Sequence, residues 1–222
     1  MKLSIVIATM NRIFMLQKCL KSIAAHTETQ YEMIIVDGGS EDGTEHWALH
    51  EGHTVIQQGH RMGAVKAFNA GFYAATGEYV TGLNDDLLLV DDCLDAAVAK
   101  LDAHEQYGQI AIPFNTPLIP KKMDQVRLAG EYWIYANFGV TRKGLGDKLN
   151  WWGDTHYHYA GDTELSMKIW NAGHLVFPLM SRCIYHLEAY DDTRVDNYDS
   201  PKFYKKWELW KGPGDDNPIF LR

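Results

Sequence analysis

An acidic triplet, Asn84-Asp85-Asp86, carries the residue types in this chain that are best suited to holding a metal cation. It follows a short apolar run that is typical of a buried strand. Carboxylates at the end of a strand can bind a divalent cation that bridges two phosphates of a nucleotide diphosphate and neutralises the departing group. Consecutive acids can also begin a helix, a role that Asp91 and Asp92 could equally perform.

Other acids and histidines lie far along the chain from this triplet. Asp162 immediately precedes an apolar pattern that predicts a helix over Thr163–Ala172, so its carboxylate could cap that helix. His186 follows the last predicted strand, and imidazole suits manganese as well as carboxylate does. His156 and His158 stand two apart on a possible strand and could alternatively face one side together as ligands.

Strands and helices alternate in the first half of the sequence. Apolar runs predict strands at Leu3–Ala8, Met33–Val36, Thr54–Gln57 and Glu78–Gly82, with helices around Ile13–Ile23, over Gly63–Ala75 and around Leu94–Leu101. This alternation favours right-handed crossovers and a mostly parallel sheet covered on both faces. Ligands of such sheets bind at the carboxyl ends of the strands, so the loops around Asn11, Asp37 and Asp86 should converge on one crevice.

The second half is less regular. Gln109–Phe114 predicts another strand, and residues 115–159 mix aromatic, glycine and charged positions without a period, so we expect irregular strands and loops there. The helix over Thr163–Ala172 is followed by predicted strands at His174–Pro178 and Cys183–His186. With 222 residues and 46% hydrophobic composition, the chain is predicted to form one domain over residues 1–222.

Composition excludes several classes of protein. A formal net charge of −8 with interspersed acids and bases argues against nucleic acid or anionic lipid as a partner. Three cysteines without paired spacing support neither a disulfide framework nor a structural zinc site, and they favour a reducing cytoplasm. The opening segment predicts a buried strand rather than a signal peptide, and no apolar run approaches the roughly 20 residues of a membrane span. Peripheral attachment to a membrane stays open.

Four segments together resemble the family 2 glycosyltransferases of the GT-A fold. They are SIVIATMNR, IIVDGGSEDGT, GHRMGAVKAFNAGFYAATGEYVTGLNDD and AGDTELSMKIWNAG, and the first three match in spacing as well as in composition. The resemblance implies an α/β fold, a single GT-A (Rossmann-like) domain with a mostly parallel central sheet flanked by helices. Residues 1–90 would form the nucleotide-binding half and residues 91–190 the acceptor and catalytic half. The tail, residues 191–222, could fold over the donor as a lid, lie on a neighbouring subunit or have no role.

The resemblance also implies roles for the acids and for His186. Asp86 would be the direct ligand of Mn²⁺ or Mg²⁺, with His186 completing the coordination, while Asn84 and Asp85 would face the donor. Asp162 matches the general base of the family, and Glu164 matches the second acid two positions later. The chain departs from the pattern at residue 161, where it has Gly and many relatives have Glu.

Nucleotide recognition would use a set of polar residues in the first half: Thr9, Asn11, Arg12, Asp37, Arg61, Gly63, Lys66 and Asn69. Gly38 stands where many relatives have a second acid that contacts the base, so a uridine donor is the default while guanosine and thymidine donors stay open. Arg61 and Lys66 could equally be solvated charges at a helix end. Trp151 and Trp152 are candidate acceptor contacts, with an ordinary place in the core as the alternative.

The sequence thus predicts a metal-dependent, inverting glycosyltransferase. It would move a sugar from a nucleotide-diphosphate donor, UDP-sugar by default, to a hydroxyl of a glycan or a related molecule. Two alternatives stay open. One is a transferase of the same fold that retains the anomeric configuration, and the other is a catalytically silent protein that binds sugar nucleotides.

Overall fold

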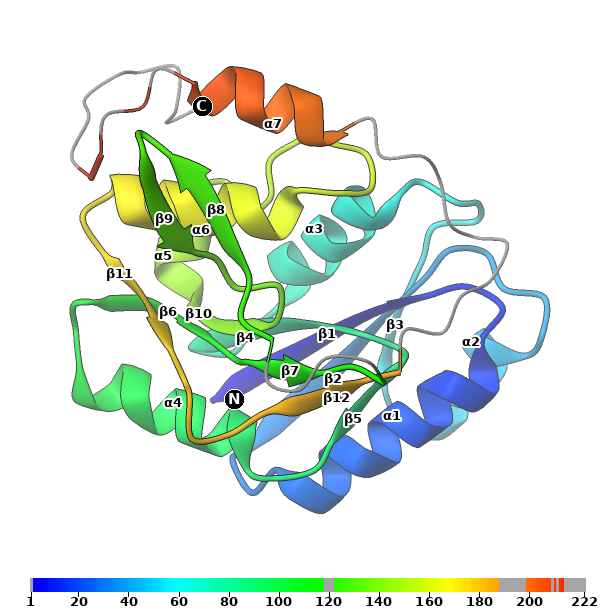
Figure 1. Ribbon diagram of the computed structural model, residues 1–222. Coiled ribbons are helices and arrows are strands. Elements are labelled where there is room, and N and C mark those ends of the chain that lie inside the picture. Colours follow the sequence, from blue (N-terminus) through cyan, green and yellow to red (C-terminus); the bar gives the residue numbers. More distant parts are fainter. Residues whose placement is uncertain (1, 118–121, 188–198, 209, 211, 214–222) are drawn as a thin grey trace.

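A seven-stranded sheet forms the centre of the molecule, with the strand order β11-β6-β10-β4-β1-β2-β3 (Figure 1). The computed structural model describes residues 2–117, 122–187, 199–208, 210, 212 and 213. The strands of this sheet are β1 (Leu3–Thr9), β2 (Tyr31–Asp37), β3 (Thr54–Gln57), β4 (Tyr79–Asn84), β6 (Tyr107–Ala111), β10 (Gly139–Arg142) and β11 (Leu175–Pro178).

The sheet is parallel except for one strand. β1 pairs in parallel with β2 and β4, and β6 pairs in parallel with β11, whereas β10 runs antiparallel between β4 and β6. The predicted mostly parallel α/β sheet is therefore confirmed. β10 was not predicted, because a strand of four residues inside an aperiodic segment gives no pattern that distinguishes it from a loop.

Helices cover both faces of the sheet, as Figure 1 shows. The apolar sides of α1 (Ile13–His26), α2 (Thr44–His50) and α4 (Cys93–Ala103) share one core with the sheet. Those of α3 (Ala64–Ala74), α5 (Lys143–Lys148) and α6 (Gly161–Asn171) share the other. α2 was missed because its sequence, TEHWALH, buries only two residues, too few for a helical period.

Three smaller units complete the fold. A three-stranded sheet joins β5 (Leu87–Leu89), β12 (Ile184–His186) and β7 (Phe114–Asn115), and a hairpin joins β8 (Gln125–Leu128) to β9 (Glu131–Ile134). α7 (Asp199–Trp207) packs with this hairpin and α6 around a separate apolar cluster that contains Met167, Phe203 and Trp207. Within the described ranges, no helix combines the length and the apolar character that a bilayer-spanning segment needs.

α3 packs unusually closely on the sheet at Gly71. A Cβ atom at residue 71 would lie 2.2 Å from Cγ1 of Val6 on β1 and 3.2 Å from Cγ2 of Val36 on β2. Because both valines are fully buried, they have no free space into which to move. The absence of a side chain at residue 71 therefore sets the distance between α3 and the strands whose ends carry the polar loops.

We expect Gly71→Ala to lower the free energy of unfolding by about 1–3 kcal/mol, the usual cost of forcing an extra carbon into a packed core. The matched control is Gly144→Ala in α5, where an added Cβ would meet no atom within 4 Å. That control should be neutral or stabilising by up to about 1 kcal/mol, because alanine favours a helix over glycine. Urea denaturation of both variants measures the difference, and equal midpoints would contradict the packing argument.

Candidate active site

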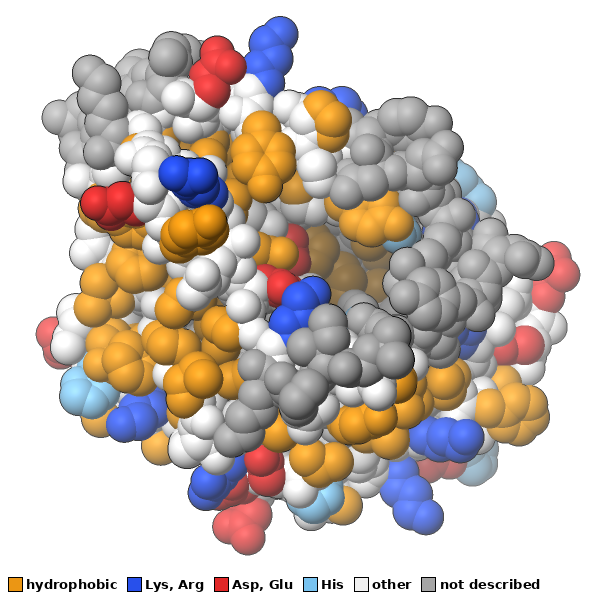
Figure 2. Space-filling view, viewed as in Figure 1, with side chains coloured by type: hydrophobic (Ala, Val, Ile, Leu, Met, Phe, Trp, Pro, Cys, Tyr) orange, Lys and Arg blue, Asp and Glu red, His pale blue; other side chains and the backbone are white. Residues whose placement is uncertain are grey.

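A cavity of about 570 Å³ opens at the carboxyl ends of β1, β2 and β4. Its lining combines Thr9 and Arg12 from the first half of the chain with the Asp85-Asp86 turn and with Asp162 from α6. Figure 2 shows this face of the molecule hollowed near its centre, where charged side chains lie beside apolar ones. The predicted convergence of loops is therefore observed at the Thr9 end of β1 and at the acidic turn.

The acidic turn is held by side chains from the end of β1. Asp85 is buried, and its Oδ2 accepts a hydrogen bond of 2.8 Å from the Thr9 hydroxyl. Arg12 lies 2.8 Å from Oδ1 of Asp85 and 3.5 Å from Oδ2 of Asp86. The turn connects β4 to β5, so these acids do not begin a helix, and that alternative is wrong.

His186 reaches Asp86 because β12 pairs antiparallel with β5, which places His186 opposite Leu87. His186 Nε2 lies 3.2 Å from Oδ1 of Asp86, and the imidazole packs edge-on against the rings of Phe114 and Phe138. Neighbouring ligands of one octahedral cation with bonds of about 2.1 Å lie about 3 Å apart, so this pair fits two adjacent coordination positions.

The chemistry of this donor pair, one carboxylate and one imidazole, suits Mn²⁺ better than a soft metal. In the part of the chain that the structure describes, no three His, Cys, Asp or Glu side chains are grouped so that they could hold a metal by themselves. A cation bound by Asp86 and His186 would therefore need further oxygen ligands from a bound molecule or from water.

Asp162 lies in the first turn of α6 and lines the cavity. It is not the N-cap of that helix, because the N-cap is Ala160, in a left-handed conformation. Oδ1 of Asp162 accepts a hydrogen bond of 2.7 Å from the backbone N–H of Thr163. Burial, together with the nearby Asp124, outweighs that bond and raises the pKa of Asp162 to about 6. A carboxyl with this pKa is suited to accept a proton near neutral pH.

Trp152 explains why residue 161 is glycine. A Cβ atom at residue 161 would lie 2.4 Å from the indole ring of Trp152, which lines the cavity beside Asp162. Asn69 of α3 fixes this tryptophan by accepting a hydrogen bond of 3.1 Å from its backbone N–H and donating one to the carbonyl of Gly153. A larger side chain at residue 161 would thus displace the indole from the cavity wall.

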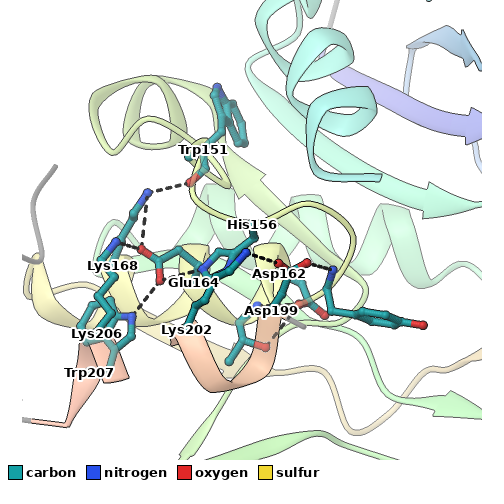
Figure 3. A network of polar contacts seen from close by, with 12 residues as sticks. Trp151, His156, Asp162, Glu164, Lys168, Asp199, Lys202, Lys206 and Trp207 are labelled. Atoms are coloured by element: carbon teal, nitrogen blue, oxygen red, sulfur yellow. Dashed lines mark hydrogen bonds and ion pairs between the residues drawn. The ribbon is translucent and has the colours of Figure 1, made fainter. Parts of the chain in front are cut away.

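Glu164 is not among the residues that line the cavity, contrary to the catalytic role predicted from the sequence. Its side chain is fully buried and accepts hydrogen bonds from Lys206 and, at 2.8 Å, from Nε1 of Trp207 (Figure 3). Lys168 and His156 lie 3.9 Å and 3.7 Å away. Burial alone would raise the pKa of Glu164, but these partners outweigh it and lower that pKa to about 2. Glu164 is therefore charged at neutral pH and joins α6 to α7.

The predicted nucleotide residues divide into two groups. Those that line the cavity are Thr9, Arg12, Arg61, Gly63, Asn84 and Asp85. Asn11, Asp37, Lys66 and Asn69 are not among its lining residues. Lys66 points to solvent on the exposed side of α3, in agreement with the alternative of a solvated charge.

The residues outside the lining support the loops that form it. Asn11 donates its backbone N–H to the Ser40 hydroxyl, and its side chain accepts the N–H of Glu41, so it joins the first two loops. Asp37 is fully buried and accepts hydrogen bonds from Ser40 and from Gln57, the latter at 2.8 Å. Both carboxylate oxygens of Asp37 are thereby used inside the protein.

Trp151 is a core residue, which corrects its prediction as an acceptor contact. It is 1% exposed, donates from Nε1 to Asp147 over 2.8 Å and packs on the ring of Phe72. His156 and His158 do not lie on a strand, and only His158 lines the cavity, so they do not form the alternative pair of ligands.

Several residues of the cavity wall were not predicted as site residues from the sequence. Asp124 and Tyr135 flank the β8–β9 hairpin, and Tyr159 precedes α6. Ser200, Phe203 and Tyr204 come from α7, in the segment for which a lid was one expectation. The described part of that segment includes a packed helix, and residues 191–198, 209, 211 and 214–222 lie outside the described residues. In the sequence, only the aromatic content of these segments could have indicated that they line a site.

The sequence profile of Glycosyl transferase family 2 matches residues 4–166. This chain belongs to that family. The match includes β1, the acidic turn and the first turns of α6, and it ends before β11, β12 and α7. The family assignment therefore covers Asp86 and Asp162, whereas His186 and the α7 residues lie beyond it.

Proteins of related sequence and structure are transferases. A PGL/p-HBAD biosynthesis glycosyltransferase of Mycobacterium tuberculosis is 36% identical over 117 residues, which cover 48% of this chain and 46% of that protein. The chain thus spans less than half the length of that relative. The TarS 1–349 fragment of S. aureus in complex with UDP-GlcNAc superposes with a TM-score of 0.70 at 19% identity, over 92% of this chain and 64% of that one.

A third similarity is to the mannosyltransferase PcManGT from Pyrobaculum calidifontis in complex with GDP-Man and Mn²⁺. Its TM-score is 0.64 at 18% identity, over 92% of this chain and 61% of that one. At these identities the two structures establish a shared fold. The expected GT-A architecture is therefore confirmed.

We expect Glu164→Gln to destabilise the protein by about 3 kcal/mol at pH 7, because it leaves buried cations without their counterion. The folded-state pKa of Glu164, about 2, lies below its ordinary value of 4.5, so this stabilisation is present above pH 4.5 and is lost as the pH falls toward 2. Urea midpoints of wild type and variant should therefore converge below pH 4.5. The exposed Glu131→Gln is the control, and a similar loss there would contradict the assignment.

Proposed function

We propose that this protein transfers a glycosyl group from a nucleotide-diphosphate sugar to an acceptor hydroxyl, with inversion at the anomeric carbon. One observation carries the proposal: Asp162, whose pKa is about 6, lines the same cavity as Asp85 and Asp86. A single in-line displacement requires a proton acceptor beside the attacking hydroxyl and groups that handle the diphosphate, both in one cavity.

The reaction would proceed in one step. The Asp162 carboxylate takes the proton of the acceptor hydroxyl while that oxygen attacks the anomeric carbon. The bond from this carbon to the terminal phosphate oxygen breaks, and the nucleotide diphosphate leaves with the electron pair. The guanidinium groups of Arg12 and Arg61, both in the cavity lining, can contact phosphate oxygens through directed N–H groups. Trp152 forms part of the cavity wall together with Asp162.

Asp86 and His186 would hold a divalent cation, Mn²⁺ or Mg²⁺. When bound, such a cation would neutralise the negative charge of the departing diphosphate. Support comes from the 3.2 Å separation of the two side chains and from the Mn²⁺ present in the PcManGT complex. Arg12 lies 3.5 Å from the other oxygen of this carboxylate, Oδ2 of Asp86.

UDP-sugar remains the default donor in this proposal. TarS 1–349 was crystallised with UDP-GlcNAc and PcManGT with GDP-Man, so the shared fold accommodates either base. The acceptor would be a hydroxyl of a glycan or a related molecule. The unpaired thiols of Cys19, Cys93 and Cys183 support a reducing compartment such as the cytoplasm.

Asp162→Asn should lower the transfer rate by about 10²–10⁴-fold, the usual contribution of a positioned base, while nucleotide binding stays unchanged. In the wild type, kcat/KM should fall below pH 6 as Asp162 becomes protonated. The control is Asp154→Asn, an exposed acid of the neighbouring loop outside the cavity lining. Undiminished transfer by Asp162→Asn would show that the base is another group. Proton NMR of the first-formed product tests inversion separately.

Asp86→Asn and His186→Ala should each remove the part of nucleotide binding that depends on metal. In thermal shift assays with UDP or GDP, wild type at 100 times the dissociation constant should gain about 2.7 kcal/mol from the ligand. Added Mn²⁺ should enlarge this shift in wild type and in the control His50→Ala, whose histidine side chain is exposed on α2. If Mn²⁺ enlarges the shift equally in the two site variants, these side chains do not hold the cation.

A further inference from the structure

α7 forms one wall of the cavity although it lies beyond the residues that the family profile matches. The profile ends at residue 166, whereas α7 spans Asp199–Trp207. Ser200, Phe203 and Tyr204 of this helix line the same cavity as Asp162. One wall of the cavity that contains Asp162 therefore comes from outside the family-matched part of the chain.

The first residue of α7 is tied to the loop that lies against the cavity. Oδ2 of Asp199 accepts hydrogen bonds from three successive backbone N–H groups, those of Tyr157, His158 and Tyr159, at 2.9, 2.7 and 2.9 Å. Asp199 is 2% exposed, and these bonds lower the pKa of its carboxyl against the effect of burial. A carboxylate with three directed donors holds the loop in one conformation.

The other end of α7 is tied to α6. Lys206 and Trp207 both donate to Glu164, two residues after Asp162, as Figure 3 shows. Beyond the helix, Nε1 of Trp210 donates to Oδ1 of Asn171 over 2.9 Å. α7 is thus fixed at one end to the loop that precedes α6 and at the other end to α6, which carries the proposed base.

The loop held by Asp199 also contacts the nucleotide side of the cavity. The carbonyl of Tyr157 accepts a hydrogen bond of 3.2 Å from the N–H of Val65, at the start of α3. A Cβ atom at residue 63 would lie 2.4 Å from that carbonyl oxygen, so Gly63 is required for this approach. The loop is therefore fixed between α7 and α3.

Tyr204 presents an exposed aromatic side chain at this wall. It is 52% exposed and lines the cavity together with Tyr135 and Asp162. Burial raises the pKa of Tyr135, and the nearby Asp162, Asp124 and Tyr204 add to this rise, which indicates that these polar groups converge. An exposed ring and several hydroxyl or carboxylate groups around a base suit a polyhydroxylated acceptor, whose C–H faces pack on rings while its hydroxyls need partners.

We propose that α7 is the acceptor-recognition element of this protein, with Tyr204 contacting the acceptor sugar and Asp199 acting as a positioning residue for the 157–159 loop. The proposal rests on the proposed glycosyl transfer. It adds which wall of the cavity contacts the acceptor. The nucleotide loops belong to the family-matched part of the chain, whereas α7 lies beyond it.

The test compares Tyr204→Ala and Tyr204→Phe with Tyr132→Ala, a matched aromatic control that is 68% exposed on β9 and outside the cavity lining. Two rates are measured for each: hydrolysis of the donor alone, using UDP-glucose, UDP-GlcNAc and GDP-mannose, and transfer to a panel of p-nitrophenyl glycosides. Tyr204→Ala should raise the acceptor KM about tenfold and change the order of preferred acceptors. Tyr132→Ala should leave both donor hydrolysis and the acceptor KM within twofold of wild type.

Asp199→Ala should raise the KM for the acceptor sugar at least as much as Tyr204→Ala does. Asp199→Asn keeps a carbonyl oxygen that can accept hydrogen bonds, so its KM should lie between those of wild type and Asp199→Ala. UDP or GDP binding to each variant checks that the nucleotide half is intact. Unchanged acceptor KM and preference in all the Tyr204 and Asp199 variants would overturn the inference while leaving the proposed function standing. Absence of both hydrolysis and transfer in wild type, with every donor, would instead overturn the proposed function.

Discussion

The site depends first on the parallel pairing of β4 with β1, which aligns Asn84 with Ala8 and so puts the acidic turn beside Thr9. Two strands that run in the same direction end at the same edge, so loops separated by more than 70 residues become neighbours. The Thr9 hydroxyl and the Arg12 guanidinium then satisfy the buried Asp85. The missing side chain at Gly71 lets α3 pack closely on these strands.

A second constraint acts in the catalytic half: a buried carboxylate needs hydrogen-bond donors or cations beside it. Glu164 takes them from α7 and from within α6, and it thereby joins a segment near the end of the chain to the helix that carries Asp162. Asp162, two residues earlier, has fewer compensating donors and keeps a raised pKa. The same helix turn thus holds one acid for structure and another suited to proton transfer, and their environments alone distinguish them.

The sequence predicted the parts of the structure that follow from local pattern. Strands β1 to β4 with α1 and α3 have clear periods, and the loops after β1 and β4 carry distinctive residue types, so their convergence could be inferred. Trp151 and Glu164 could not be assigned correctly, because whether an aromatic ring or an acid faces a cavity depends on packing between distant segments. β10 and the α7 wall were beyond reach for the same reason. β10 pairs with β4 and β6, and Trp207 of α7 bonds to Glu164, so the partners of both elements come from other segments of the chain.

The attachment of α7 has a consequence for how such a protein can diversify. Asp199 binds backbone N–H groups, which any residue except proline provides, so the 157–159 loop can change its side chains without losing that anchor. Tyr204 likewise lies on the exposed face of α7 and is not one of the buried core residues that stabilise the sheet. Mutation can therefore alter the surface that meets one substrate while the strands, the acidic turn and the base are inherited unchanged.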